Sequence, residues 1–135
     1  MSGSRLVDTN VIIRYLVQDH EKHSRTATKL IEACDRGEVT LILLPVVVAE
    51  CVFVLESFYG RPRTEIAGIL SRLIASPGVE LTDLDVHLDA LSRYVGSKLH
   101  FVDCVIAADA AARGIPVAAF DGDFRKFSDL KVELD

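Results

Sequence analysis

The longest apolar run of the chain lies in residues 39–55, VTLILLPVVVAECVFVL, where Glu50 is the only charged residue. A continuous apolar segment such as 39–44 is typical of a parallel strand that is buried on both faces. Pro45 suits the first turn of a helix, because its missing N–H needs no partner there. The run therefore predicts a buried strand over 39–44 that leads directly into a helix over 45–59.

Strands and helices alternate on both sides of this run. Short apolar segments bounded by turn residues predict strands at 5–8, 79–81, 116–120 and, as a final edge strand, 131–134. Apolar residues at helical spacing predict helices at 11–16, 20–36, 64–75, 83–98 and 102–113. We therefore expect an α/β fold in one domain over residues 1–135, with a mainly parallel sheet and helices on both faces.

Half of the 135 residues are hydrophobic, which is enough for a full core without disulfides or structural metals. Cys34, Cys51 and Cys104 are odd in number and form no CxxC pair. The pattern favours buried free thiols and a cytoplasmic protein. No segment resembles a signal peptide, and residues 41–55 are fewer than the ~20 that span a bilayer, so we expect no membrane partner.

The net charge of −5 argues at first against a nucleic-acid partner. The objection weakens if several of the carboxylates share one pocket and bind divalent cations, because the metal then inverts the local field.

Glu50 is the first candidate for such a site. The residues three and four positions away on its helix are all apolar, which predicts apolar surroundings for the carboxylate. Buried acids are normally paired, protonated or bound to metal. The alternative is a solvent-facing or structurally paired Glu50.

Asp8 and Asp103 are two further candidates. Asp8 ends the strand over 5–8, and Thr9 and Asn10 follow it as residues that commonly cap helices. Asp103 lies in the first turn of an apolar helix, where an acid can also simply favour the helix dipole. Asp109 lies six residues further along that helix, about 120° away around its axis, and is expected to be exposed or locally paired.

The pair Asp121 and Asp123 follows the strand over 116–120, the place where ligands bind in α/β sheets. Asp-Gly-Asp is also common turn chemistry. Asp123 is the better candidate for capping the turn into residues 124–127.

Carboxylates that converge from separate elements repel one another unless a cation joins them. Oxygen ligands of this kind suit Mg²⁺ or Mn²⁺, which can lower the pKa of a bound water and stabilise displacement at phosphorus. The four histidines stand apart from these acids, which argues against zinc.

Four blocks together resemble the PIN-domain family, and most closely its VapC-type toxins. They are VDTNV at 7–11, PVVVAE at 45–50, FVDCVIAA at 101–108 and FDGDF at 120–124, and the likeness runs from about Leu6 to Leu134. It implies a three-layer α/β/α fold with a central, mainly parallel sheet.

The resemblance also implies an activity, a Mg²⁺- or Mn²⁺-dependent endoribonuclease that acts as the toxin of a type II toxin–antitoxin pair. Asp8, Glu50, Asp103 and Asp121 match the catalytic acids of the family, and Asp8 and Asp103 match those that hold the metal. Thr9, Asn10 and Asp123 match supporting positions. Family members often have Ser or Thr two residues before the fourth acid, where this chain has Ala119, so Asp121 and Asp123 remain alternatives. RNA, a cognate antitoxin and a second copy of the chain are the implied partners.

Two other functions compete with this one. A catalytically idle PIN fold could serve as a binding module, but the presence of all four acids argues against it. A divalent-metal-dependent phosphatase of the haloacid-dehalogenase type would need a second carboxylate two residues after Asp8, and this chain has Asn10 there.

Overall fold

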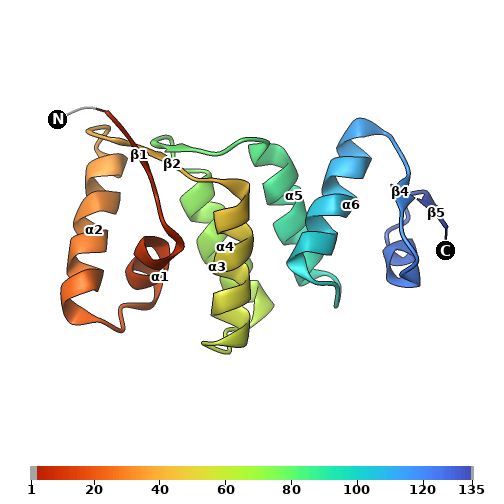
Figure 1. Cartoon of the computed structure of the whole chain (residues 1–135), viewed down its shortest axis with the longest axis horizontal. Coiled ribbons are helices and arrows are strands. Elements are labelled where there is room, and N and C mark those ends of the chain that lie inside the picture. The colour runs from red at the N-terminus through yellow and green to blue at the C-terminus, as the bar shows by residue number, and fades with distance from the viewer. Residues whose placement is uncertain (1–2, 135) are drawn as a thin grey trace. The chain divides into compact units, whose positions relative to one another are not determined.

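A computed structural model describes residues 3–134 of the protein. The chain divides into two compact units, Met1–Thr82 (unit 1) and Asp83–Asp135 (unit 2). Figure 1 colours unit 1 from red to green and unit 2 from green to blue. Both units combine helices with short parallel strands, which confirms the predicted α/β class.

Unit 1 holds a three-stranded parallel sheet in the order β1-β2-β3. Leu41 at the centre of the sheet lies opposite Arg5 on one side and Val79 on the other. Helices α1 and α3 pack against each other, and α1 also packs on α2. The elements of unit 1 are β1 (Ser4–Leu6), α1 (Thr9–Val17), α2 (Glu21–Asp35), β2 (Thr40–Ile42), α3 (Pro45–Ser57), α4 (Arg63–Ile74) and β3 (Val79–Glu80).

Unit 2 is built on the packing of two helices, α5 against α6, with a two-stranded parallel sheet beside them. The Tyr94 and Phe101 rings meet edge to face, with their centroids 6.0 Å apart. Arg93 on α5 forms ion pairs with Asp89 and with Asp129 near the C-terminus, which ties the end of the chain to the helix. The elements of unit 2 are α5 (Leu84–Val95), α6 (Phe101–Arg113), β4 (Val117–Ala118), the 3₁₀ helix η1 (Gly122–Lys126) and β5 (Val132–Glu133).

Every predicted helix and strand is present within a few residues of its predicted bounds. The strands are shorter than predicted, because their last residues already form the links to the following helices. The apolar run that predicted a strand over 39–44 forms β2 over three residues. The helix η1 was not predicted, since Gly122 and the two flanking acids read as a simple turn. That residues 1–135 form one domain stays a prediction.

Gly78 marks a close approach within unit 1, just before β3. A Cβ atom added there would lie 2.5 Å from the carbonyl oxygen of Cys34 and 2.6 Å from its Sγ atom. We therefore expect Gly78→Ala to lower the free energy of unfolding by about 1–3 kcal/mol, the usual cost of overpacking.

Urea unfolding of the two proteins measures this effect. Gly68→Ala is the matched control, because Gly68 lies inside α4 and its added Cβ would meet only the end of Arg72 at 3.8 Å. Alanine in a helix interior should stabilise unit 1 by about 0.5–1 kcal/mol. Equal urea midpoints of unfolding for wild type and Gly78→Ala would show that the close approach of Gly78 to Cys34 does not constrain the fold.

Candidate active site

Asp8 lies between β1 and α1 and is the N-cap of α1. Its backbone is extended, with φ −85° and ψ 151°, and its Oδ2 atom accepts a long hydrogen bond of 3.4 Å from the backbone N–H of Asn10. The side chain is exposed. The cap therefore orients the carboxylate weakly while leaving it accessible to a ligand.

Thr9 is the first residue of α1 and is 5% exposed. Its Oγ1 atom is buried and has no hydrogen-bond partner among the described residues. A buried hydroxyl without a partner costs about 1–3 kcal/mol. Asn10, one residue further on, is exposed.

Glu50 is exposed, which corrects the prediction of apolar surroundings. The buried face of α3 consists of Val48, Cys51, Val52 and Leu55, each at most 2% exposed. Val46 and Phe53, which share the stripe of Glu50, are 70% and 67% exposed. Helix α3 is apolar on all sides, so the apolar neighbours of Glu50 in the sequence did not reveal which face is buried.

The charges of Asp8 and Glu50 both act on Cys51 in unit 1. Burial, with smaller contributions from the negative charges of Glu50 and Asp8, raises the pKa of the Cys51 thiol to about 12. Both charges therefore act on the same buried thiol, and α1, which Asp8 caps, packs on α3.

In unit 2, Asp103 lies in the first turn of α6, as predicted. Phe101 and Cys104 in the same turn are buried, whereas Asp103 itself is half-buried. His100, the N-cap of α6, forms no side-chain capping hydrogen bond. Asp103 therefore lies at the start of a helix that packs against α5. Asp109, on the same helix, forms an ion pair with Arg113 at 2.9 Å, which confirms that it is locally paired.

Asp121 is the N-cap of η1, and its Oδ1 atom accepts a hydrogen bond of 2.9 Å from the backbone N–H of Asp123. The prediction that Asp123 caps this turn was wrong. Asp123 instead approaches Lys126 at 3.8 Å. The backbone at Asp121 is extended, as is usual for an N-cap, and Asp123 lies inside the first turn of η1, where it donates the N–H that is capped.

A family model for the PIN domain matches residues 5–130. The chain belongs to the PIN-domain family. The match covers both units and all four predicted acids, so the resemblance found in the sequence blocks is confirmed.

A crystal structure of the Mycobacterium tuberculosis toxin VapC20, described as cleaving the sarcin–ricin loop, is similar to this PIN domain. The two share 24% sequence identity over 93% of this chain and 94% of the toxin, with a TM-score of 0.41. No curated protein matches the chain significantly. Within residues 3–134, no helix is both long and apolar enough to cross a membrane.

The four predicted acids of this PIN domain share one electrostatic property. Within residues 3–134, neither Asp8 nor Glu50, Asp103 or Asp121 forms an ion pair. Nine of the fifteen other described acids pair with arginine or lysine, namely Asp19, Glu21, Glu38, Glu56, Glu65, Asp89, Asp109, Asp123 and Asp129. Six, namely Glu32, Asp35, Glu80, Asp83, Asp85 and Glu133, share the lack of an ion pair.

These four side chains suit a hard divalent cation, because they offer only carboxylate oxygens that no cationic side chain neutralises. The part of each unit that the structure describes contains no group of three or more His, Cys, Asp or Glu side chains that could hold a metal ion. Two of the four acids belong to unit 1 and two to unit 2.

The unpartnered hydroxyl of Thr9 leads to a prediction. We expect Thr9→Val, which keeps the shape of the side chain and removes the hydroxyl, to raise the free energy of unfolding by about 1–2 kcal/mol. We also expect it to lower the activity of the PIN domain, because Thr9 adjoins Asp8. Urea unfolding and turnover of an RNA substrate measure the two effects.

Ser24 provides the matched control. It is 2% exposed on α2, and its Oγ atom also lacks a partner within residues 3–134. Ser24→Ala should stabilise the protein and leave turnover unchanged. A Thr9→Val protein with full activity would show that the Thr9 hydroxyl has no part in the site.

Proposed function

We propose that this PIN domain is a Mg²⁺- or Mn²⁺-dependent endoribonuclease that uses Asp8, Glu50, Asp103 and Asp121. The observation that carries the proposal is that Asp8, Glu50, Asp103 and Asp121 are carboxylates that no cationic side chain within residues 3–134 neutralises, in a chain that belongs to the PIN-domain family.

Asp8 and Asp103 are proposed to hold the metal. Asp8 is oriented by the Asn10 N–H at the start of α1, and Asp103 by the first turn of α6. When bound, the metal would lower the pKa of a water and stabilise negative charge on the phosphodiester. Glu50, which belongs to unit 1 as Asp8 does, is exposed and can accept a proton from an attacking water. Asp121 adds negative charge that favours cation binding, and Thr9, Asn10 and Asp123 support the neighbouring acids.

The alternatives have less support. Asn10 is an exposed amide beside Asp8, and an amide cannot act as the proton donor and acceptor that an aspartyl-phosphate phosphatase requires. A catalytically idle binding module has no use for four acids that lack cationic partners.

We further propose that the protein is a VapC-type toxin that acts in the cytoplasm, is inhibited by a cognate antitoxin and forms a homodimer. Exposed apolar side chains on α3 and α6 support a protein partner, because such side chains commonly mark interaction sites. Those on α3 are Val46 and Phe53, and those on α6 are Val102 and Ile106. The three buried free thiols support a reducing compartment.

The test of the nuclease itself compares three substrates at fixed Mn²⁺. The purified wild-type protein is incubated with single-stranded RNA, with single-stranded DNA of the same sequence and with p-nitrophenyl phosphate. We expect internal cleavage of RNA, and no release of p-nitrophenol. The Asp8→Asn protein, purified in the same way, controls for contaminating nucleases.

Equal RNA cleavage by wild type and Asp8→Asn would contradict the proposal. Release of p-nitrophenol by wild type alone, without RNA cleavage, would favour the phosphatase instead.

A further inference from the structure

Unit 1 has a hollow of about 570 Å³ beside Asp8, between α1 and α2. Its floor is apolar, and four polar side chains stand around it. The lining residues are Asn10, Val11, Arg14, His23, Thr26, Ala27 and Leu30. Asn10 donates its backbone N–H to the Asp8 carboxylate, so the hollow begins next to the proposed metal ligand.

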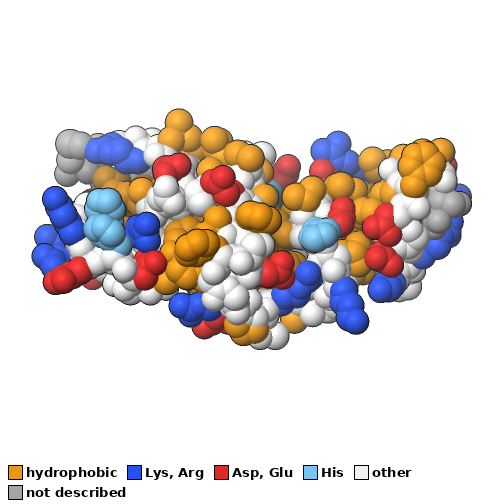
Figure 2. All heavy atoms as spheres, turned by 60° about the horizontal axis from the view of Figure 1, so that its bottom comes forward, with side chains coloured by type: hydrophobic (Ala, Val, Ile, Leu, Met, Phe, Trp, Pro, Cys, Tyr) orange, Lys and Arg blue, Asp and Glu red, His pale blue; other side chains and the backbone are white. Residues whose placement is uncertain are grey.

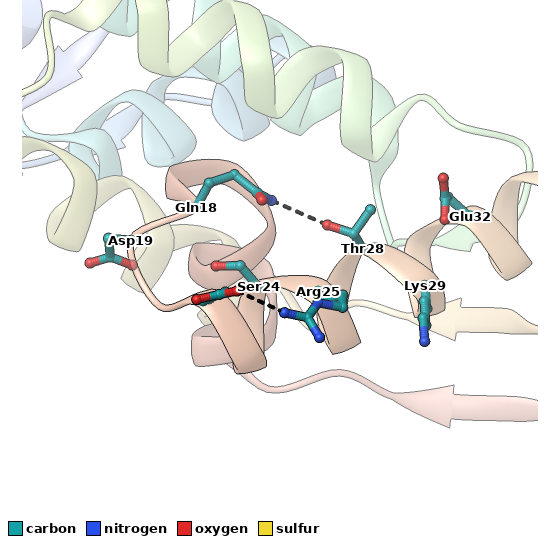
Figure 3. Close-up of a pocket in the computed structure, with 8 residues that line it drawn as sticks. Gln18, Asp19, Ser24, Arg25, Thr28, Lys29 and Glu32 are labelled. Atoms are coloured by element: carbon teal, nitrogen blue, oxygen red, sulfur yellow. Dashed lines mark hydrogen bonds and ion pairs between the residues drawn. The ribbon is translucent and has the colours of Figure 1, made fainter.

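No carboxylate lines this hollow, although Asp8 lies beside it. Another polar hollow of unit 1, of about 710 Å³, is different (Figure 3). Asp19, Glu21 and Glu32 line it, Arg25 is paired with Glu21 at 3.0 Å, and the Gln18 amide donates to Thr28. The three carboxylates there outnumber the two basic side chains, Arg25 and Lys29, whereas the hollow beside Asp8 presents a cation and an imidazole and no carboxylate.

Arg14 is held in place at the edge of the hollow beside Asp8. Its Nη1 atom donates to Asp19 at 2.8 Å, and the Tyr59 hydroxyl donates to the other oxygen of Asp19 at 2.7 Å. This contact with Asp19 raises the pKa of Arg14. The guanidinium has five N–H groups in a planar fork, so a fixed Arg14 retains donors and a flat face for a ligand.

His23 supplies a second flat surface at the start of α2. Its ring stacks on the His20 ring with the centroids 4.0 Å apart and 17° between the planes. The Nδ1 atom of His20 also accepts the backbone N–H of His23, which fixes the turn. Figure 2 shows histidine side chains with basic side chains over the end of the molecule where α2 lies.

An apolar floor, a stacked imidazole and a restrained guanidinium together suit a flat heterocycle. Single-stranded RNA is recognised by stacking of unpaired bases on His or aromatic rings and on Arg. Resting on the proposed ribonuclease function, we infer that this hollow is a nucleobase subsite for the RNA strand bound at Asp8. Arg14 and His23 stack on the base. The exposed Asn10 amide offers a hydrogen-bond donor and an acceptor to the edge of the base.

Binding in excess EDTA tests the subsite separately from cleavage. The probes are fluorescein-labelled single-stranded RNAs of one base type, about ten nucleotides long, and an abasic ribose-phosphate strand of the same length. Fluorescence anisotropy gives the dissociation constant of each. We expect wild type to bind at least one of the base-containing strands about tenfold more tightly than the abasic strand.

His23→Ala and Arg14→Gln should each reduce that preference by about threefold to tenfold, with most of the loss on the base-containing strand. Lys22→Ala is the matched control, because Lys22 is exposed on the same turn of α2 but does not line the hollow. This substitution should weaken the binding of the base-containing and the abasic strand equally, and so leave the preference for bases unchanged. His23 is exposed, so His23→Ala should keep the wild-type urea midpoint.

If the preference for bases is unchanged in both His23→Ala and Arg14→Gln, the proposal of a nucleobase subsite is wrong. The hollow would then more simply bind an apolar side chain of a protein partner. Absence of RNA binding or of any base preference in wild type would overturn the proposal as well. If the preference falls as expected while wild type cleaves no RNA with Mn²⁺, the subsite stands and the nuclease proposal fails.

Discussion

Replacing Asp8 or Asp103 by Asn should lower the rate of RNA cleavage by about two orders of magnitude or more at fixed Mn²⁺. Each substitution keeps the size of the side chain and removes one negative charge from a proposed metal ligand. Both residues lie at the start of a packed helix, so the loss should come from the site and leave the fold intact. Single-turnover rates for the two variants and wild type measure the effect.

Substitution of Asp121 or Asp123 should lower the cleavage rate less than substitution of Asp8 or Asp103. Asp121 caps η1 on a glycine-containing loop, so we expect Asp121→Asn to lower the rate by about tenfold. Asp123 is exposed and approaches Lys126, so Asp123→Asn should change the rate by less than about twofold. If Asp123→Asn were as inactive as Asp103→Asn while Asp121→Asn kept its activity, the assignment of Asp121 as the fourth acid would be wrong.

Millimolar Mn²⁺ should raise the melting temperature of wild type by about 5–10 °C. A ligand at about 100 times its dissociation constant stabilises the folded state by about 2.7 kcal/mol, and a domain of this size converts that into several degrees. The rise should be absent in Asp8→Asn and Asp103→Asn and remain in Asp123→Asn. Differential scanning calorimetry with and without Mn²⁺ measures it, and an equal rise in all four proteins would place the metal elsewhere.

The Glu50→Gln variant tests whether Glu50 has a functional or a structural role, because its stability and its cleavage rate can be measured separately. Glu50 is exposed and forms no ion pair within residues 3–134. Without metal, the free energy of unfolding of Glu50→Gln should therefore differ from that of wild type by less than about 0.5 kcal/mol. Its cleavage rate should nevertheless fall strongly. A large loss of stability in the metal-free variant would instead make Glu50 a pairing partner within the fold.

The elements of this PIN domain could be predicted from local sequence because strong local signals coincide with them. Pro45 begins α3 as its fixed φ suggests, and Asp8 caps α1 as an acid before an apolar helix should. Asp103 lies in the first turn of α6 for the same kind of local reason. In each case the deciding interaction lies within a few residues along the chain.

The predictions that failed depended on contacts that the sequence does not show. The exposure of Glu50 could not be inferred, because α3 is apolar all round and its packing on α1 and α4 selects its buried face. Asp121 and Asp123 are equally good capping residues, and the choice between them depends on where the Asp123 N–H points. The hollow between Asn10 and His23 arises from how α1 and α2 pack, so no local pattern predicted it. Convergence of the four acids stays a prediction.

One measurement tests the metal-dependent mechanism most directly, the rate of RNA cleavage by the wild-type protein in Mn²⁺, after excess EDTA, and after Mn²⁺ is restored. The mechanism predicts cleavage in the first condition, none above the Asp8→Asn background in the second, and full recovery in the third. Because EDTA removes the cation and leaves the folded protein in place, the loss reports on the metal alone. Undiminished cleavage in excess EDTA would contradict the proposal that Asp8 and Asp103 act through a bound metal ion.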